Sequence, residues 1–356
     1  MISPESRVRG CLLGGAIGDA LGAPVEFDSL ARIRQRYGPG GLDDYAADWR
    51  GKTGLITDDT QMTLFTAEGL IRAGVRERER GVCAPVEVVR NAYLRWLDTQ
   101  DHAAPPPAGG LVRTGWLREQ AWLYSRRAPG TTCLSGLRQG PAAPAAGGAP
   151  GPVNPGSKGC GTVMRSAPFG LAAADPGAAF RLSAECAQIT HGHPTGYLAA
   201  GAFAAIVALL ARGASVGEAV TGALGLLAAH PGHEETSAAL RAAADLAASG
   251  DPAPEAVESL GGAWVAEEAL AIAVYCALVH EHDITRALLL AVNHSGDSDS
   301  TGAVCGNLLG ARHGEQALPS RWLSALEGRD TIAELAGDLA AHIAGAPLDR
   351  AKYPGS

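Results

Sequence analysis

Four glycines recur at every fourth position near the start of the chain, at Gly10, Gly14, Gly18 and Gly22. The apolar residues between them follow helical spacing, which places all four glycines on one face of a helix. Such a glycine face lets a second backbone approach more closely than side chains would allow. Since each glycine in a helix costs up to ~1 kcal/mol relative to alanine, we expect tight packing on this face to compensate. Pro24 is expected to end the helix.

The rest of the chain also carries helical patterns, and no run shows the alternation flanked by hairpin turns that would indicate strands. A helix is expected to begin at the acidic cluster near residue 57. Further helices are expected at residues 86–98, 111–124, 180–189, 195–212, 217–228, 236–249, 263–280, 284–292, 301–311 and 331–344. We therefore predict an all-α fold, a compact multi-helix orthogonal bundle that forms a single domain over residues 1–356. Residues 31–54 are expected to form a loop, and Pro/Gly-rich surface loops are expected near residues 103–110 and 129–156.

Composition limits what such a fold can do. Hydrophobic residues make up 46% of the 356 residues and charged residues 19%, as expected of a globular protein with a large core. The net charge of −8 argues against sequence-independent binding of nucleic acid, which needs a basic surface. It leaves open a nucleic acid that carries a small modification as a substrate.

The N-terminus, the longest apolar run and the cysteines predict a soluble cytoplasmic protein. Residues 1–7 lack the apolar region of a signal peptide. The longest apolar run, residues 196–211, is shorter than the ~20 residues of a membrane span, and we interpret it as a buried core helix. The seven cysteines are odd in number and form no CxxC pair, so neither a disulfide framework nor a structural zinc site is expected. A monomer is the default expectation.

Two clusters of acidic and hydroxyl residues differ from the Ala- and Gly-rich background. The first is residues 57–60 (Thr-Asp-Asp-Thr), and the second, within residues 293–302, contains Asp297 and Asp299. One capping residue is enough to start a helix, so the two adjacent acids of the first cluster exceed that need. Carboxylate and hydroxyl oxygens are the ligands that hard divalent cations prefer. We therefore predict that the fold brings both clusters together around metal, with a pocket beside it.

Other metal sites fit the sequence less well. Residues 297–302 begin like the loop of a calcium-binding EF-hand, but Leu308 stands where a bidentate glutamate is needed. An all-α isoprenoid synthase is disfavoured because the acids at residues 58–59 lack the third acid of a DDxxD helix, and only 5% of residues are aromatic. A zinc pair at His191 and His193 is disfavoured by their spacing. One of these histidines is expected to line the pocket or to cap a helix.

Residues 154–168 contain closely spaced glycines and lead into a helix. Backbone amides in such a loop can converge on an anion, and Lys158 and Arg165 lie nearby in the sequence. The loop lacks the GxxxxGK[ST] pattern and no strand precedes it, so a plain turn stays open alongside phosphate binding. Glu26 follows the first helix, where a solvated loop acid stays open alongside a role in a cleft.

Five segments resemble the ADP-ribosylglycohydrolase family in the same order, over residues 9 to about 312. They are residues 10–27 (GCLLGGAIGDALGAPVEF), 57–64 (TDDTQMTL), 158–168 (KGCGTVMRSAP), 190–197 (THGHPTGY) and 293–302 (NHSGDSDSTG). Five motifs in the right order are far more specific than any one of them. The resemblance implies an all-α fold with two Mg²⁺ (or Mn²⁺) ions at the bottom of a cleft that binds ADP-ribose.

Residue by residue, the resemblance implies three groups of site residues. The metal ligands would be Thr57, Asp58, Asp59, Asp297, Asp299 and Ser300. The catalytic residues would be Asp299, which would touch both ions, and Glu26, which matches a mobile acid beside the scissile bond. The ADP-ribose would be bound by Ser157, Lys158, Gly159, Gly161 and His191. Ser300 keeps the hydroxyl of the threonine usual in the family, whereas Cys160 stands where some relatives have asparagine.

The function implied by the resemblance is metal-dependent hydrolysis of the N- or O-glycosidic bond between ADP-ribose and an acceptor, with ADP-ribose as a product. The acceptor would be a protein side chain, such as arginine or serine, or a nucleic acid, and the residues do not distinguish them. No membrane partner is expected. Glu26 would act as general acid or base. A non-catalytic ADP-ribose-binding relative of the same fold is the alternative, and the presence of every acidic ligand weighs against it.

Overall fold

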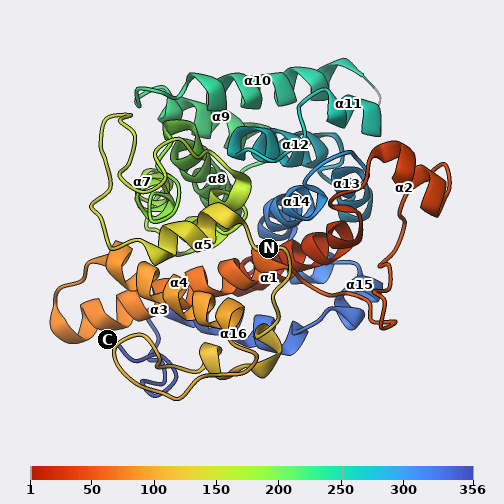
Figure 1. Ribbon diagram of the computed structural model, residues 1–356. Helices are drawn as coiled ribbons and strands as arrows, with labels where there is room; N and C mark the ends of the chain where they lie inside the picture. The colour runs from red at the N-terminus through yellow and green to blue at the C-terminus, as the bar shows by residue number, and fades with distance from the viewer. Residues whose placement is uncertain (1, 251, 356) are drawn as a thin grey trace.

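The computed structural model describes residues 2–250 and 252–355, and Figure 1 shows its arrangement. The predicted all-α fold is confirmed, because helices and short 3₁₀ turns form the regular structure, and the described ranges contain isolated β-bridges but no strand. The α-helices are α1 Pro4–Gly22, α2 Leu30–Tyr37, α3 Asp58–Arg80, α4 Pro85–Asp101, α5 Thr131–Arg138, α6 Ala167–Ala172, α7 Pro176–Ala187, α8 Pro194–Ala211, α9 Val216–Leu227, α10 Glu234–Ser249, α11 Pro254–Glu258, α12 Ala266–Val279, α13 Ile284–Val292, α14 Ser298–His313, α15 Ser320–Ala325 and α16 Arg329–Ile343.

Helix α1 packs antiparallel to α14 through glycines of both helices (Figure 1). A Cβ atom added to Gly18 would lie 1.9 Å from the carbonyl oxygen of Gly302, and one added to Gly306 would lie 2.0 Å from that of Gly14. The obstructing atoms belong to the backbone of a packed helix, which cannot move aside cheaply. The predicted close approach of a second backbone to the glycine face is therefore confirmed.

This antiparallel packing brings the end of α1 beside the start of α14. A Cβ atom on Gly22, the last residue of α1, would lie 2.4 Å from the amide nitrogen of Asp299 in the first turn of α14. The chain leaves α1 through a 3₁₀ turn, Ala23–Val25, and Glu26 follows it directly. As a result, Glu26 and Asp299, which come from opposite ends of the sequence, share one region of the molecule.

Two apolar helices, α8 and α12, form the interior. Every residue of α8 from Thr195 to Ala208 is buried, as is every residue of α12 from Ala269 to Ala277. Helix α8 is long and apolar enough to span a membrane by length and composition, but 83% of it is buried inside the fold. The predicted core helix at residues 196–211 is therefore confirmed. Each large apolar side chain buried in this way contributes about 1.5–3 kcal/mol to folding.

The expected loop at residues 31–54 contains a helix. Helix α2 lies within its first part, and the Ser29 side chain caps it by accepting a hydrogen bond from the amide of Arg32 at 3.3 Å. Only two of its side chains are buried, Leu30 and Ile33. The polar composition of this segment led to the prediction of a loop. A short surface helix needs only a narrow apolar stripe, so its sequence can be mostly polar.

The prediction of a helix at residues 111–124 is wrong. Two 3₁₀ turns form there instead, Leu117–Glu119 and Ala121–Leu123. The segment packs on the C-terminal part of the chain, where the amide of Trp116 donates to the carbonyl of Lys352 at 3.2 Å. The Lys352 ammonium also lies 4.1 Å from the centre of the Trp116 ring. These tertiary contacts override the local helical pattern.

The Pro/Gly-rich segment at residues 129–156 is not loop throughout. Helix α5 forms within it and buries Cys133, Leu134 and Leu137. Residues 139–156 and 103–110 contain no helix, as the composition predicts. Helix α5 is important for the site because its first residues line the cavity described below.

Candidate active site

Helices α3 and α14 begin at the same cavity, which brings the two acidic clusters together. The Thr57 side chain caps α3 by accepting a hydrogen bond from the amide of Asp59 at 3.3 Å. Asp297 caps α14 by accepting one from the amide of Ser300 at 3.4 Å. The cavity measures about 410 Å³, and the residues of both clusters that line it are Asp58, Asp59, Asp297, Asp299 and Ser300. The positive ends of two helix dipoles favour anionic groups there.

Carboxylates crowd one another in this cavity. Candidate ligand oxygens of Glu26, Asp297 and Asp299 all lie within 4.8 Å of one another, and all three residues are buried. Burial, together with the charges of Asp297 and Asp58, raises the pKa of Glu26 to about 8. Burial and the neighbouring carboxylates also raise the pKa values of Asp58, Asp59 and Asp299 well above the ordinary range. The cluster therefore has a strong electrostatic reason to bind a cation.

The donor set fits a hard divalent cation. Oδ2 of Asp59 is buried without a hydrogen-bond partner in the described part of the chain, in a residue that is 3% exposed. A buried carboxylate oxygen without a donor is unfavourable unless a cation compensates it. With Asp297, Asp299 and Ser300 it offers the oxygen ligands that Mg²⁺ and Mn²⁺ prefer. Thr57 lines a neighbouring cavity instead.

The glycine-rich loop reaches the cavity through Gly159, Cys160 and Gly161. A Cβ atom on Gly161 would lie 2.7 Å from the sulfur of Cys133, so this position has no room for a side chain. The 3₁₀ turn Cys160–Thr162 continues from the loop. Its backbone amides suit an anionic group such as a diphosphate.

Ser157 and Lys158 do not line the cavity. The Lys158 ammonium pairs with Glu235 at 2.7 Å and also with Glu267. The Ser157 hydroxyl lies 3.2 Å from the hydroxyl of Thr132. The Lys158 charge is therefore engaged by two carboxylates, and the contacts of both residues with ADP-ribose stay predictions.

His191 lines the cavity as a neutral ring. Its Nδ1 lies 2.8 Å from Oγ1 of Thr190, and Nη2 of Arg165 donates to the same hydroxyl at 2.7 Å. Since arginine can only donate, the hydroxyl proton goes to one of two acceptors, Nδ1 of His191 at 2.8 Å or the carbonyl of Ala187 at 3.4 Å. The shorter contact favours Nδ1 as the acceptor. This tautomer carries its proton on Nε2, near Gly159. Burial and the Arg165 charge hold the pKa of His191 well below its usual value.

Asp19 supports the start of α3, although the sequence analysis does not single it out. Its fully buried carboxylate accepts hydrogen bonds from the amides of Thr57 and Thr60, both at 3.0 Å, and from the Thr60 hydroxyl at 2.5 Å. Burial raises its pKa to about 6, although these hydrogen bonds oppose the rise. The available signal is a single acid beside Gly18 inside the otherwise apolar stretch of residues 10–25.

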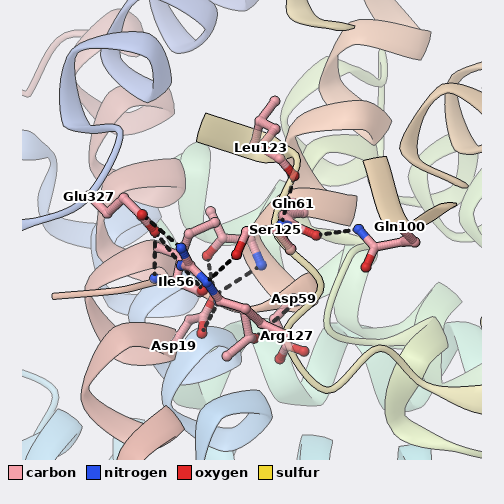
Figure 2. Close-up of polar contacts among 11 residues, drawn as sticks. Asp19, Ile56, Asp59, Gln61, Gln100, Leu123, Ser125, Arg127 and Glu327 are labelled. Atoms are coloured by element: carbon pink, nitrogen blue, oxygen red, sulfur yellow. Dashed lines mark hydrogen bonds and ion pairs between the residues drawn. The ribbon is translucent and has the colours of Figure 1, made fainter. Parts of the chain in front are cut away.

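Figure 2 shows how Arg127 joins the segment before α3 to the C-terminal part of the chain. Its Nη2 lies 2.8 Å from Oε1 of Glu327, and its Nη1 donates to the carbonyl of Ile56 at 2.6 Å. In the first turns of α3, Gln61 donates to the carbonyl of Ser125 at 2.9 Å. These contacts fix the segment that leads into the first acidic cluster.

A second cavity of about 400 Å³ adjoins the first, since Glu26, Phe27 and Ala128 line both. Its other lining residues include Trp49, which is 84% exposed, and Lys52. Glu26 therefore lies where the two cavities meet.

Comparisons with known proteins agree with this geometry. The family model described as ADP-ribosylglycohydrolase matches residues 2–348. The chain belongs to the ADP-ribosylglycohydrolase family. The predicted resemblance is thereby confirmed, as is the prediction that the protein is an enzyme of this class.

Relatives and a solved structure match along nearly the whole chain. The chain is 28% identical over 330 residues to the ADP-ribosyl-(dinitrogen reductase) glycohydrolase of Rhodospirillum rubrum, which covers 91% of this chain and 92% of that protein. It is 24% identical over 350 residues to an ADP-ribosylarginine hydrolase of Pseudomonas putida, over 95% of this chain and 80% of the relative. A solved structure described as an ADP-ribosylglycohydrolase-related protein complex matches with a TM-score of 0.65 and 26% identity, over 95% of this chain and 98% of the other.

Proposed function

We propose that this enzyme uses two Mg²⁺ (or Mn²⁺) ions to hydrolyse the N- or O-glycosidic bond between ADP-ribose and a modified protein side chain such as arginine or serine. The observation that carries the proposal is the position of Glu26. Its carboxylate lies within 4.8 Å of candidate ligand oxygens of Asp297 and Asp299, and Glu26 lines both cavities. The cavity with the acidic clusters would take ADP-ribose, and the adjoining cavity would take the acceptor.

The ions would be held by Thr57, Asp58, Asp59, Asp297, Asp299 and Ser300. When bound, they would supply Lewis-acid stabilisation of developing charge and would orient the ribose hydroxyls. Asp299 would be the shared ligand. The amide of Ser300 donates to its Oδ1 at 3.0 Å, which orients the carboxylate before any ligand binds.

Glu26 would donate a proton to the leaving acceptor and accept one from the attacking water. Burial, reinforced by Asp297, raises the pKa of Glu26 to about 8 in the metal-free protein. In the proposed reaction, the protonated carboxyl would donate to the leaving atom of the acceptor. The carboxylate left behind can accept a proton from the water that attacks the C1″ carbon of the ribose. The acceptor then leaves with one proton, ADP-ribose gains the hydroxyl, and Glu26 regains its proton.

The remaining predicted residues would bind the unreactive part of the substrate. The amides of the loop at Gly159 and Gly161 would neutralise the diphosphate. Nε2–H of His191 would donate to an oxygen of ADP-ribose. Ser157 and Lys158 would act at the adenosine and diphosphate end, after the Lys158 ion pairs rearrange.

The acceptor would leave through the adjoining cavity. The exposed indole of Trp49 can stack on a guanidinium group, as it does on that of Arg50, whose Cζ lies 4.2 Å from the ring centre. Two of the named relatives are an ADP-ribosylarginine hydrolase and a glycohydrolase of ADP-ribosylated dinitrogen reductase. ADP-ribosylarginine in a protein is therefore the first substrate to test, ahead of a modified nucleic acid. We also propose that the enzyme is a cytoplasmic monomer, consistent with seven free cysteines.

The test is release of ADP-ribose from peptides that carry it on arginine or on serine. Wild-type enzyme with Mg²⁺ should release it from at least one peptide, and excess chelator or Asp299→Ala should abolish release. Asp245→Ala, which removes an exposed acid from α10, is the matched control and should stay active. Hydrolysis that persists with Asp299→Ala or in chelator would contradict the metal proposal. Tight binding without release would instead indicate the non-catalytic alternative.

A further inference from the structure

Cys160 places a thiol among the carboxylates of the site. Its sulfur lies 2.7 Å from Oδ2 of Asp297, and both residues line the same cavity. The backbone holds Cys160 in place, because its amide donates to the carbonyl of Trp264 at 3.2 Å. A sulfur donor is unexpected in a site whose other donors suit hard cations, which select oxygen ligands.

A second feature of the cavity points independently to a cation. Oδ2 of Asp59 is buried without a hydrogen-bond partner among the described residues, and Asp59, 3% exposed, lines the cavity together with Cys160. The candidate ligand atom of Asp297 also lies within 4.8 Å of those of Glu26 and Asp299. One sulfur and several carboxylate oxygens are therefore available in the same cavity.

Cys133 provides a contrast within the same cavity. Its sulfur accepts a hydrogen bond from the guanidinium of Arg165 at 3.5 Å. A positive charge at that distance disfavours a second cation at the sulfur. The sulfur of Cys160 lies beside the carboxylate of Asp297, whereas that of Cys133 lies beside the guanidinium of Arg165. Of these two thiols, Cys160 is therefore the one that suits a cation.

We propose that Cys160 and Asp297 form a ligand pair for a thiophilic divalent cation of the Zn²⁺ class, which would compete with Mg²⁺ or Mn²⁺ for the centre. Zn²⁺ accepts thiolate and carboxylate ligands, and it binds mixed sites of this kind more tightly than Mn²⁺ does. When the sulfur–metal bond forms, the thiol proton leaves to solvent. The proposal concerns binding and does not depend on the proposed hydrolysis.

The test is a titration of the metal-free, full-length protein with Co²⁺, which substitutes for Zn²⁺ and shows sulfur-to-metal charge-transfer absorption when a thiolate binds it. The band should appear with wild-type protein and with Cys133→Ser, and it should be absent from Cys160→Ser. In competition with a chromophoric chelator, Cys160→Ser should bind Zn²⁺ about 100-fold more weakly, since even outer partners of a metal ligand contribute roughly 10–100-fold.

Absence of the band from wild-type protein would overturn the proposal, as would its persistence in Cys160→Ser or in the second variant, Cys160→Asn. The wild-type result decides even if a variant does not fold, and circular dichroism checks each variant. Mg²⁺-dependent release of ADP-ribose is measured on the same wild-type preparation. No band with intact hydrolysis rejects the thiol ligand alone, whereas a band without hydrolysis supports the thiol ligand and rejects only the proposed reaction.

Discussion

Oγ1 of Thr190 lies 2.8 Å from Nδ1 of His191, and this contact favours the tautomer in which Nε2 can donate to a substrate. Arg165 donates to the same hydroxyl at 2.7 Å, so the hydroxyl proton points either to the ring or to the more distant carbonyl of Ala187 at 3.4 Å. The buried guanidinium of Arg165 thereby influences the ring that lines the cavity through the side chain of Thr190. It also keeps the ring neutral, because burial and its own charge lower the pKa of His191.

Thr190→Val should weaken substrate binding, because it keeps the shape of the side chain but removes the hydroxyl. His191 would lose the partner that selects its tautomer. We expect KM to rise about tenfold, equivalent to ~1.4 kcal/mol, with a smaller change in kcat. NMR of isotope-labelled histidine should report a changed protonation pattern of the ring. Thr221→Val, at an exposed position of α9, is the control. An unchanged KM and an unchanged NMR pattern would show that the Thr190 hydroxyl does not select the tautomer of His191.

Glu26→Gln should remove a pH dependence from the stability of the metal-free protein. The folded pKa of about 8 lies above the ordinary value of 4.5, chiefly because of burial. Between these values the folded protein binds a proton that the unfolded chain has released. The stabilising contribution is therefore complete at low pH and is lost as pH rises through about 8. In chelator, the melting temperature of wild-type protein should fall more steeply than that of Glu26→Gln over this range, and parallel curves would count against the raised pKa.

Mg²⁺ should raise the melting temperature of the wild-type protein. Burial and mutual repulsion disfavour the ionised forms of Asp58, Asp59 and Asp299, and a cation relieves this. A ligand that binds only the folded state stabilises it by about 2.7 kcal/mol at a hundredfold excess over Kd. The effect should be larger at about pH 8 than at about pH 6, because protons compete for the same oxygens.

The control for this measurement is a pair of variants. Asp297→Asn combined with Asp299→Asn should lose the Mg²⁺ effect, whereas Asp245→Asn, on the exposed face of α10, should keep it. A Mg²⁺ effect that survives in the double variant would mean that the cation binds elsewhere.

Gly18→Ala should destabilise the protein strongly. The new Cβ would lie 1.9 Å from the carbonyl oxygen of Gly302, and only backbone movement could relieve this contact. We expect unfolding free energy to fall by ~3 kcal/mol or more, at the upper end for overpacked cores. Gly225→Ala in α9 meets nothing within 4 Å and should stabilise by up to ~1 kcal/mol. Denaturant unfolding of both variants measures the difference, and similar effects would contradict close packing of the glycine face.

Segments with a clear apolar face could be predicted from sequence alone. The pattern predicts a helix at residues 284–292, and α13 spans Ile284–Val292. The glycine face of α1 predicts a close neighbour but not which one, although Gly302, Gly306 and Gly310 repeat with the same spacing. The choice of partner is a tertiary property, as is the loss of the helix expected at residues 111–124.

In the candidate site, too, some features could be predicted from the sequence and others could not. The acidic clusters could be predicted to meet, because their composition exceeds what helix capping requires. The direction of the Lys158 side chain could not, since it depends on Glu235 and Glu267 from two distant helices. Asp19 was missed because one acid in an apolar stretch of a helix gives no indication that it will accept hydrogen bonds from the start of α3.

The contact between α1 and α14 also constrains when the centre can first exist during synthesis. A nascent chain exposes Asp58 and Asp59 long before the ribosome adds Asp297 and Asp299, and its first helix must wait with the glycine face uncovered. Domains whose distant segments pair late are the ones that remain open to misfolding and aggregation for longest. The proposed cation centre can therefore assemble only after most of the polypeptide has emerged, and a product terminated before Asp297 would lack its second acidic cluster.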